Sequence, residues 1–437
     1  MDTSTRSLLE TETIQICQDL IRIPSVNFGE GKGNEKAIAD YVVKSLADAG
    51  IQSTIYESAP GRCNVVARIK GSNPERSGLV VHGHLDVVPV NADDWSVDPF
   101  CGEIIDGMLW GRGAVDMKNM DAMILATVRE WSRIGYIPTR DIVLAFFADE
   151  EAGSIYGSHW MVDKHPELFA GCSEAISEVG GFSVTLTNGK RLYMIETAEK
   201  GIHWMKLTAH GRAGHGAVEN TENALTRLAE VVAKIGSHQW PQRYSETVKT
   251  LFKKIAEVTG KAYDEKDLRP LIVEMGFAGR MIGPTLQNSA NPTMLEAGYK
   301  ANVIPGSASA VIDGRFIPGF EDELNETIES LIGQHVTLET ITRDKALEVP
   351  FEGELVEAMC QAILKEDPEA IPVPYVMFGG TDNKALAELG IIGYGFSPLK
   401  LAEEFDFGVM FHGVDERVPI EGLTFGVRVL KDFLENC

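Results

Sequence analysis

Two short, continuously apolar runs that end in acids or histidines constrain the fold of this chain most. GLVVHGH starts at Gly78 and DIVLAFFADEE at Asp141, and between them apolar residues recur on one helical face from Met120 to Ile134. Such runs are typical of strands buried on both faces, and a strand–helix–strand order predicts a parallel sheet. We therefore predict an α/β fold with a mostly parallel sheet flanked by helices.

Acids and histidines stand at the ends of these and similar apolar runs. They are His84 and Asp86 in VVHGHLDVVP, Asp116 in GRGAVDMK, Glu150 and Glu151 in FFADEEAG, Glu178 in ISEVGG, and His412 in MFHGVDERVP. Loops at the C-terminal edge of an open α/β sheet gather ligands, so carboxylates and imidazoles placed there can converge on two divalent cations. Each motif alone is weak, because an isolated acidic pair is usually a solvated surface. Their joint occurrence predicts a two-metal hydrolase site.

Composition excludes several classes of partner. The chain has 437 residues and a net charge of −24, whereas binding to nucleic acid or to an anionic membrane needs a basic field. The segment MDTSTRSLLETETIQ lacks the features of a signal peptide, and no stretch approaches 18 uninterrupted apolar residues. We expect a cytoplasmic protein whose six cysteines are reduced.

The spacing of apolar residues along the chain changes near Thr197. ETAEKGIHWMKLTAHGRAGHG and YKANVIPGSASAVIDGRF alternate as strands do, VTLETITR from Val336 is strand-like, and the segments at about Glu222–Ile235 and Glu321–Ile332 have a helical period. This is the composition of a separate αβ sandwich, and His412 lies beyond it. We therefore predict a discontinuous catalytic domain, residues 1–198 and 347–437, interrupted by an inserted domain, residues 199–346.

In their order and residue sequences, these segments resemble those of a zinc-dependent metallopeptidase family. The family comprises aminoacylases, glutamate carboxypeptidases, acetylornithine deacetylases and succinyl-diaminopimelate desuccinylases. The resemblance runs from Ile21 nearly to the end of the chain. It rests on GHLDVVP from Gly83, WGRGAVDMK from Trp110, ADEEAGS from Ala148, NVIP from Asn302, DGR from Asp313 and GGTD from Gly379. It implies a zinc-exopeptidase-like catalytic domain and an inserted lid and dimerisation domain, hence a homodimer.

The resemblance also implies a role for each candidate ligand. Asp116 would bridge two Zn²⁺ ions per subunit, with His84 and Glu178 completing one site and Glu151 and His412 the other, and Co²⁺ or Mn²⁺ could substitute. A cis peptide is expected between Asp116 and Met117. Asp86 lies two residues after His84, where its carboxylate can take the ring N–H. If the acidic pair is extended, Glu150 points away from Glu151 and is free to act as general base.

Six further positions match substrate-handling residues of the family. His215 matches a lid histidine that reaches the partner subunit's active site, and otherwise it is an exposed turn residue. Asn302 and Arg315 match residues that grip the substrate carboxylate, although Arg315 could form an interdomain ion pair. Gly379, Gly380 and Thr381 match a turn that lines the substrate pocket; a bare GGT is otherwise only a turn.

Two departures from the family's patterns concern specificity. Asn119 stands where many members have glycine, and Asp382-Asn383-Lys384 replaces a serine-led segment of the desuccinylases. Glu178, an aspartate in other members, resembles the aminoacylase, deacetylase and desuccinylase side. We expect a dizinc amidohydrolase for N-acyl amino acids or small peptides with a free carboxylate, with a deacylase favoured over a dipeptidase or carboxypeptidase. A non-catalytic binding protein on this scaffold is the alternative class; it would have lost a ligand or the base, and all are present.

Overall fold

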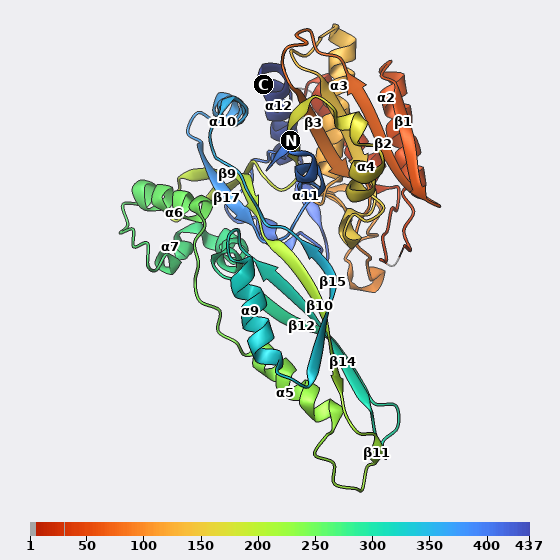
Figure 1. Ribbon diagram of the computed structural model, residues 1–437. Helices are drawn as coiled ribbons and strands as arrows, with labels where there is room; N and C mark the ends of the chain where they lie inside the picture. Colours follow the sequence, from red (N-terminus) through yellow and green to blue (C-terminus); the bar gives the residue numbers. More distant parts are fainter. Residues whose placement is uncertain (1–5, 30) are drawn as a thin grey trace.

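The computed structural model describes residues 6–29 and 31–437, which build a large sheet with helices on both faces and a smaller sheet projecting from it (Figure 1). The large sheet has ten strands. Its main path runs β1 (Ser53–Ala59), β2 (Arg62–Ile69), β6 (Ile142–Phe147), β3 (Gly78–His84), β7 (Cys172–Ser177), β18 (Ile392–Gly395), β9 (Arg191–Glu199) and β16 (Leu347–Glu348). Both β8 (Phe182–Thr185) and β17 (Ile371–Met377) pair with β9. The middle strands β6, β3, β7 and β18 are parallel to one another.

The two apolar runs form the parallel pair at the centre of this sheet. All residues of β3 and β6 are buried, as the continuous apolar pattern predicts. Alternate side chains enter different cores: Leu79 and Leu144 join one with helix α3 (Lys118–Ile134), and Val80 and Val143 join the other. The first core also contains α1 (Leu8–Ile21) and α12 (Ile420–Asn436), and the second contains α4 (Ser158–Lys164) and α11 (Asn383–Leu386). The predicted α/β fold is confirmed.

The smaller sheet is antiparallel. Its order is β12 (Ser289–Ala297), β14 (Ser307–Phe316), β10 (Gly201–His210) and β15 (Val336–Asp344). Side chains of β10 alternate between buried and less buried, and the buried ones form a separate core with α5 (Ala224–Gly236) and α9 (Glu321–Ile332). The tip of this unit carries β11 (Gly214–His215) paired with β13 (Val303–Ile304) (Figure 1).

One segment departs from the predicted inserted domain. It comprises α6 (Glu246–Thr259), α7 (Arg269–Ile272), η5 (Val273–Ala278), α8 (Gly279–Ile282) and η6 (Gly283–Leu286). Its buried side chains, such as Leu251 and Phe252, belong to the core of the large sheet and not to that of the small one. The range 199–346 therefore joins two differently packed pieces, because an amphipathic pattern does not show which sheet a helix covers. We propose the division into two domains with this segment assigned to the catalytic one.

The remaining elements are short or peripheral. They are α2 (Lys36–Asp48), η2 (Ala92–Asp94), β4 (Ile104–Ile105), β5 (Met108–Trp110), η3 (Glu150–Ala152), η4 (Pro166–Phe169), α10 (Glu354–Glu366), η7 (Ala387–Leu389), η8 (Phe407–Val409) and β19 (Arg417–Pro419). At the start of α2, the Asn34 side chain accepts the Lys36 amide. All six cysteines are free. Within residues 6–29 and 31–437, no helix is both long and apolar enough to cross a membrane.

Candidate metal centre and active site

Five of the predicted ligands meet at one edge of the large sheet. His84 ends β3, Glu151 follows β6 and Glu178 follows β7, whereas Asp116 precedes α3 and His412 lies between η8 and β19. They form two groups that share Asp116: His84, Asp116 and Glu178, and Asp116, Glu151 and His412. In each group the potential ligand atoms lie within 4.8 Å of one another. The parallel strands bring the first three residues together because their C-terminal ends lie at the same edge.

The two carboxylate oxygens of Asp116 face different histidines. Oδ1 lies 3.1 Å from Nε2 of His84, and Oδ2 lies 3.3 Å from Nε2 of His412. Nε2 of His84 is also 3.6 Å from Glu178, and Nε2 of His412 is 2.9 Å from Glu151. The peptide bond between Asp116 and Met117 is cis, as the resemblance implies. One carboxylate with an oxygen toward each group can bridge two cations.

The cluster has more buried acids than neighbouring bases. Burial raises the pKa of Glu178 to about 8 and that of Glu151 to about 7, and it raises the pKa of Glu150 well above its usual range. Hydrogen bonds to Asp116 and Glu151 raise the pKa of His412 to about 10. The buried Oε1 of Glu151 has no hydrogen-bond partner within the described part of the chain. Divalent cations would compensate the negative charge that these buried carboxyl groups carry when they are ionised. The mixed imidazole and carboxylate donors suit zinc.

The acidic pair is held by Asp86, although not in the way that the sequence predicts. The Asp86 carboxylate accepts the main-chain amides of Glu150 and Glu151, each at 3.1 Å, and the side-chain amide of Asn27 at 2.8 Å. Nδ1 of His84 lies 3.0 Å from the main-chain oxygen of Asp86 and 3.6 Å from its carboxylate. We expected the His84 ring N–H to contact the Asp86 carboxylate. The ring nitrogen instead lies closer to the main-chain oxygen of Asp86, because the carboxylate already accepts three amide groups.

The geometry of Glu150 and Glu151 is also different from the extended segment that we expected. Both residues lie in the 3-10 helix η3, where successive side chains point about 120° apart. Glu151 contacts His412, whereas Oε2 of Glu150 lies 3.9 Å from Nε2 of His84. The two side chains diverge as predicted, but the backbone that carries them is a turn of 3-10 helix and not an extended strand.

A cavity of about 620 Å³ lies over this cluster, between the large and small sheets. Its lining includes Asp116, Glu150, Glu151, Glu178 and His412, together with the predicted substrate residues Arg315, Gly379, Gly380 and Thr381. Arg315 forms an ion pair with Asp313 of the same strand, with Nε 2.7 Å from Oδ1. Arg315 therefore pairs with a residue of its own strand and not across the two domains. Its guanidinium group still borders the cavity.

Two predicted residues lie elsewhere. His215 and Asn302 are exposed at the tip of the small sheet, where the amide of Gly216 donates to the main-chain oxygen of Asn302 at 2.9 Å. Nδ1 of His215 accepts the amide of Ala217 at 3.1 Å. Figure 1 places this tip far from the large sheet, where β3 lies. A single chain therefore brings these two residues together but does not bring them to the cavity.

Sequence reasoning missed several buried charged residues in and beside the wall of the pocket. The Glu199 carboxylate accepts the amide and the hydroxyl of Thr381 at 2.9 and 2.6 Å, which fixes the GGT turn. Nζ of Lys384 donates to the main-chain oxygens of Lys200 and Lys345, in the two connections between the sheets. Burial lowers the pKa of Lys200 to about 7. The only signal for this network was the departure at Asp382-Asn383-Lys384.

Asp382 connects the same segment to the loop after Glu151. Its Oδ1 accepts the hydroxyls of Ser154 and Ser158 at 2.7 and 2.6 Å. Asn383 continues the connection, because its side-chain oxygen lies 2.9 Å from Nε2 of His82, two residues before His84. The unusual segment therefore supports the loops that carry both halves of the candidate site.

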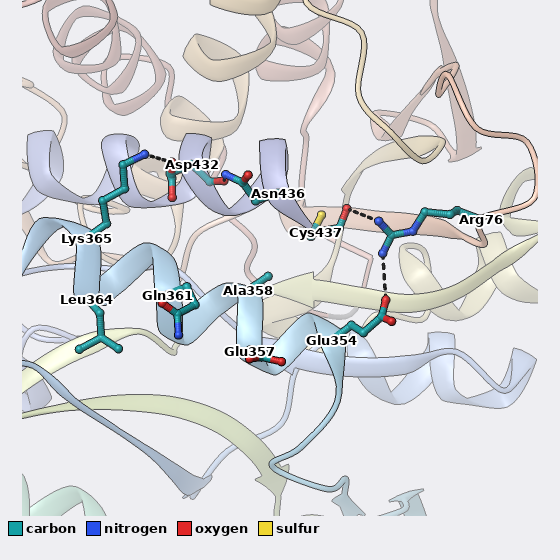
Figure 2. Close-up of a pocket in the computed structure, with 10 residues that line it drawn as sticks. All are labelled: Arg76, Glu354, Glu357, Ala358, Gln361, Leu364, Lys365, Asp432, Asn436 and Cys437. Atoms are coloured by element: carbon teal, nitrogen blue, oxygen red, sulfur yellow. Dashed lines mark hydrogen bonds and ion pairs between the residues drawn. The ribbon is translucent and has the colours of Figure 1, made fainter.

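Another cavity, of about 760 Å³, lies between α10 and α12 (Figure 2). Arg76 there contacts Glu354 at 3.3 Å and the main-chain oxygen of Cys437 at 3.2 Å, and Lys365 pairs with Asp432. These charges are already paired, and the residues that line the cavity include none of the predicted site residues. The chemistry therefore belongs to the cavity over Asp116.

The sequence and the fold of this chain are similar to those of known proteins. The model of Peptidase family M20/M25/M40 matches residues 80–436. The N-fatty-acyl-amino acid synthase/hydrolase PM20D1 of Bos taurus is 26% identical over 435 residues, covering 95% of this chain and 86% of that protein. Aminoacylase-1 of Sus scrofa is 26% identical over 433 residues, covering 97% and 95%.

Solved structures share the fold. An M20 family metallo-carboxypeptidase from Sulfolobus solfataricus superposes with a TM-score of 0.75 at 18% identity, covering 97% of this chain and 99% of that one. The dipeptidase Dug1p from Saccharomyces cerevisiae gives a TM-score of 0.73 at 17% identity, covering 98% and 96%. At these identities the match concerns the fold.

Proposed function

Because this chain belongs to Peptidase family M20/M25/M40 and is a metal-dependent hydrolase, we propose that it cleaves the amide bond of N-acyl amino acids at two metal ions. The observation that carries the proposal is the position of Asp116, whose two oxygens face His84 in one ligand group and His412 in the other. This arrangement supports a bridging carboxylate, with Glu178 completing the first site and Glu151 the second.

Zinc is the proposed metal, with Co²⁺ or Mn²⁺ as substitutes, because the ligands are imidazoles and carboxylates without thiolates. When bound, the two ions would activate water and polarise the substrate carbonyl. Glu150 takes the proton from the attacking water and passes it to the leaving amine nitrogen. The Asp86 carboxylate holds Glu150 in position through its main-chain amide.

The substrate carboxylate is proposed to bind Arg315 and the turn formed by Gly379, Gly380 and Thr381. A guanidinium group can donate two parallel hydrogen bonds to a carboxylate, and Arg315 borders the same cavity as the metal cluster. The Glu199 carboxylate supports this role, because it holds Thr381 through two hydrogen bonds and so fixes the turn.

His215 and Asn302 are proposed to act in the active site of a partner subunit. Both are exposed at the tip of the small sheet, away from the cavity of their own chain. In a homodimer formed through this sheet, His215 would donate a hydrogen bond to the oxyanion, and Asn302 would contact the substrate. Each active site would then require two chains.

A deacylase is favoured over a dipeptidase or carboxypeptidase. Aminoacylase-1 and an N-fatty-acyl-amino acid synthase/hydrolase are each 26% identical to this chain over nearly its whole length, whereas the two peptidases above are 18% and 17% identical to it. The test is a hydrolysis screen of N-acetyl, N-succinyl and longer N-acyl amino acids beside dipeptides, with added zinc and with a chelator. Zinc-dependent hydrolysis of N-acyl amino acids, at least tenfold faster than that of dipeptides, is expected.

Two results of this screen would overturn the assignment. Faster hydrolysis of dipeptides would make the protein a peptidase of the same family. Binding of these ligands without hydrolysis, in protein that holds its metals, would indicate a non-catalytic binding protein.

A further inference from the structure

The proposed site for the substrate carboxylate has one half on each sheet. Arg315 belongs to β14 of the small sheet, whereas the GGT turn, residues 379–381, follows β17 of the large sheet. Both halves line the cavity over the metal cluster. A carboxylate can contact both halves only when the two sheets are held at the right separation. The segments that join the sheets therefore determine whether the two halves act together.

Lys384 holds two of these joining segments. Lys200 lies between β9 and β10, and Lys345 lies between β15 and β16, so each stands where the chain passes between the sheets. Nζ of Lys384 donates to the main-chain oxygen of Lys200 at 2.8 Å and to that of Lys345 at 2.7 Å. Its neighbours Ala385 and Leu386 are buried in a core of the large sheet. One ammonium group therefore fastens both segments to the large sheet.

Lys384 also contacts the GGT turn. A Cβ atom at Gly380 would lie 2.3 Å from Cε of Lys384, so the backbone of the turn packs directly on the lysine stem. Nζ of Lys384 lies 3.4 Å from the carboxylate of Glu199, which accepts the amide and the hydroxyl of Thr381. The same side chain therefore supports the turn directly and, through Glu199, a second time.

The contacts of Lys384 leave it no donor for a substrate. Its side chain is only 2% exposed. An ammonium group has three N–H donors, and the oxygens of Lys200, Lys345 and Glu199 around Nζ can accept all three. Lys384 can therefore affect a bound carboxylate only through the residues that it holds in place.

Arg315 lies close to this support within the small sheet. In the strand register, it is opposite Ile202 of β10 and opposite Ser289 of β12. Ile202 follows Lys200 by two residues, and Ser289 follows Gln287 by two residues. Nζ of Lys200 donates to the main-chain oxygen of Gln287 at 2.9 Å. Both strands beside Arg315 are thus fastened together next to the segment that carries Lys200.

We propose that Lys384 is a positioning residue that sets the separation between Arg315 and the GGT turn, and thereby the selectivity for substrates with a free carboxylate. The inference rests on the proposed function, since it takes these two halves as the carboxylate site. Without the ammonium group, the oxygens of the two joining segments lose their common donor. The small sheet then shifts relative to the turn, and a carboxylate no longer contacts both halves.

The experiment compares a substrate that has a free carboxylate with its neutral carboxamide. The substrate is the N-acyl amino acid or dipeptide that the wild-type protein hydrolyses fastest. Lys384→Met, which replaces the ammonium group by an apolar one, should raise KM for the free acid by about 10- to 100-fold and leave kcat within about threefold. The kcat/KM for the carboxamide should change less than about threefold. Equal losses for the two compounds would overturn the proposal.

A double variant tests whether Lys384 acts through Arg315. Arg315→Met alone should lose the same selectivity for the free acid. Adding Lys384→Met to it should then raise KM by less than about threefold, because both changes remove one shared contact. Losses that multiply would show that the two residues act independently and would contradict the proposal.

Arg140→Met is the matched control for the loss of a buried cation. The guanidinium group of Arg140 donates to the main-chain oxygens of Ser77 and Gly78 at 2.6 and 2.9 Å and pairs with Glu174 at 2.7 Å. These contacts lie at the start of β3, at the opposite end of that strand from His84. Arg140→Met should lower the melting temperature and keep the selectivity. A loss of selectivity there too would show that general loosening is the cause.

A second substitution covers a failure of Lys384→Met to fold. Lys384→Gln keeps a polar head group, but its shorter side chain cannot reach the oxygens of both Lys200 and Lys345. It should lose the same selectivity for the free acid. If it folds and retains the selectivity of the wild-type protein, the proposal is wrong.

Binding measurements separate this inference from the proposed function. Calorimetry in the Glu150→Gln background gives the affinities for the free acid and the carboxamide without consuming either. If the wild-type protein hydrolyses neither, the proposed function fails, and a binding preference that Lys384→Met abolishes still supports the inference. If the acid is hydrolysed but Lys384→Met leaves the preference unchanged, or if no preference exists, the inference fails and the hydrolase assignment stands.

Discussion

The carboxylate of Asp86 accepts the main-chain amide of Glu150 at 3.1 Å, and its second oxygen accepts the next amide, that of Glu151, at the same distance. Asp86 is fully buried. One side chain therefore orients the turn that directs Glu151 toward His412 and that carries Glu150, the proposed general base. The link between Asp86 and catalysis is positional, because its carboxylate is fully engaged away from the pocket.

Asp86→Asn should lower kcat by about 10- to 100-fold while most of the metal stays bound. The side-chain amide can accept only one of the two main-chain N–H groups and turns its own N–H₂ toward the other. Steady-state kinetics and metal analysis of the same preparation measure both effects. An unchanged kcat would show that η3 keeps its geometry without Asp86.

Glu150→Gln should lose about 10²- to 10⁴-fold in kcat and keep both metal ions, because the change removes a base and no ligand. Glu151→Gln is the matched comparison on the neighbouring residue, and it should weaken metal binding. Metal content after dialysis distinguishes the two. If Glu150→Gln loses a metal ion and Glu151→Gln does not, the two roles are reversed.

Acid stability should depend on Asp141, at the start of β6. Partial burial raises its pKa, but the amide of Gly71 and the cations of Lys70 and Arg68 outweigh this and lower the pKa to about 2. A carboxyl with a lowered folded-state pKa stabilises the protein above its unfolded pKa, near 4, and the contribution disappears as the pH falls toward 2. Because solvent screens these exposed ion pairs, its size is about 1 kcal/mol or less in the free energy of unfolding.

Asp141→Asn should therefore destabilise the protein at pH 7 by up to about 1 kcal/mol, after screening of the exposed pairs by solvent, and by about half as much at pH 3. Urea unfolding at both pH values measures the difference. An equal loss at the two pH values would mean that the ion pairs with Lys70 and Arg68 contribute little and that the mutation acts through packing.

Subunit mixing tests the role assigned to His215. His215→Ala and Glu150→Gln should each be nearly inactive, whereas a heterodimer would contain one site with its own Glu150 and the partner's intact histidine. Activity should return to about half of the wild-type level per heterodimer if the sites are independent. No recovery after verified subunit exchange would show that His215 serves its own chain or is not catalytic.

The sequence predicts the large sheet and the metal cluster better than the surroundings of the cluster. The continuous apolar runs of β3 and β6 carry their own signal, and parallel strands must end at a common edge, so His84 and Glu151 come together there. Asn27, Glu199 and Lys384 have no comparable signal, because isolated polar residues in a sequence do not show that they are buried. The packing of α6 on the large sheet was missed for a similar reason: an apolar helical face fits either core.

Metal titration tests the central claim most directly. Metal-free protein should bind two Zn²⁺ ions per subunit, with activity rising until the second site is filled, and His412→Ala should bind one ion tightly because the group of His84, Asp116 and Glu178 remains complete. Elemental analysis and activity are measured on the same samples. Saturation at one ion per subunit with full activity would contradict a site in which Asp116 bridges two metals.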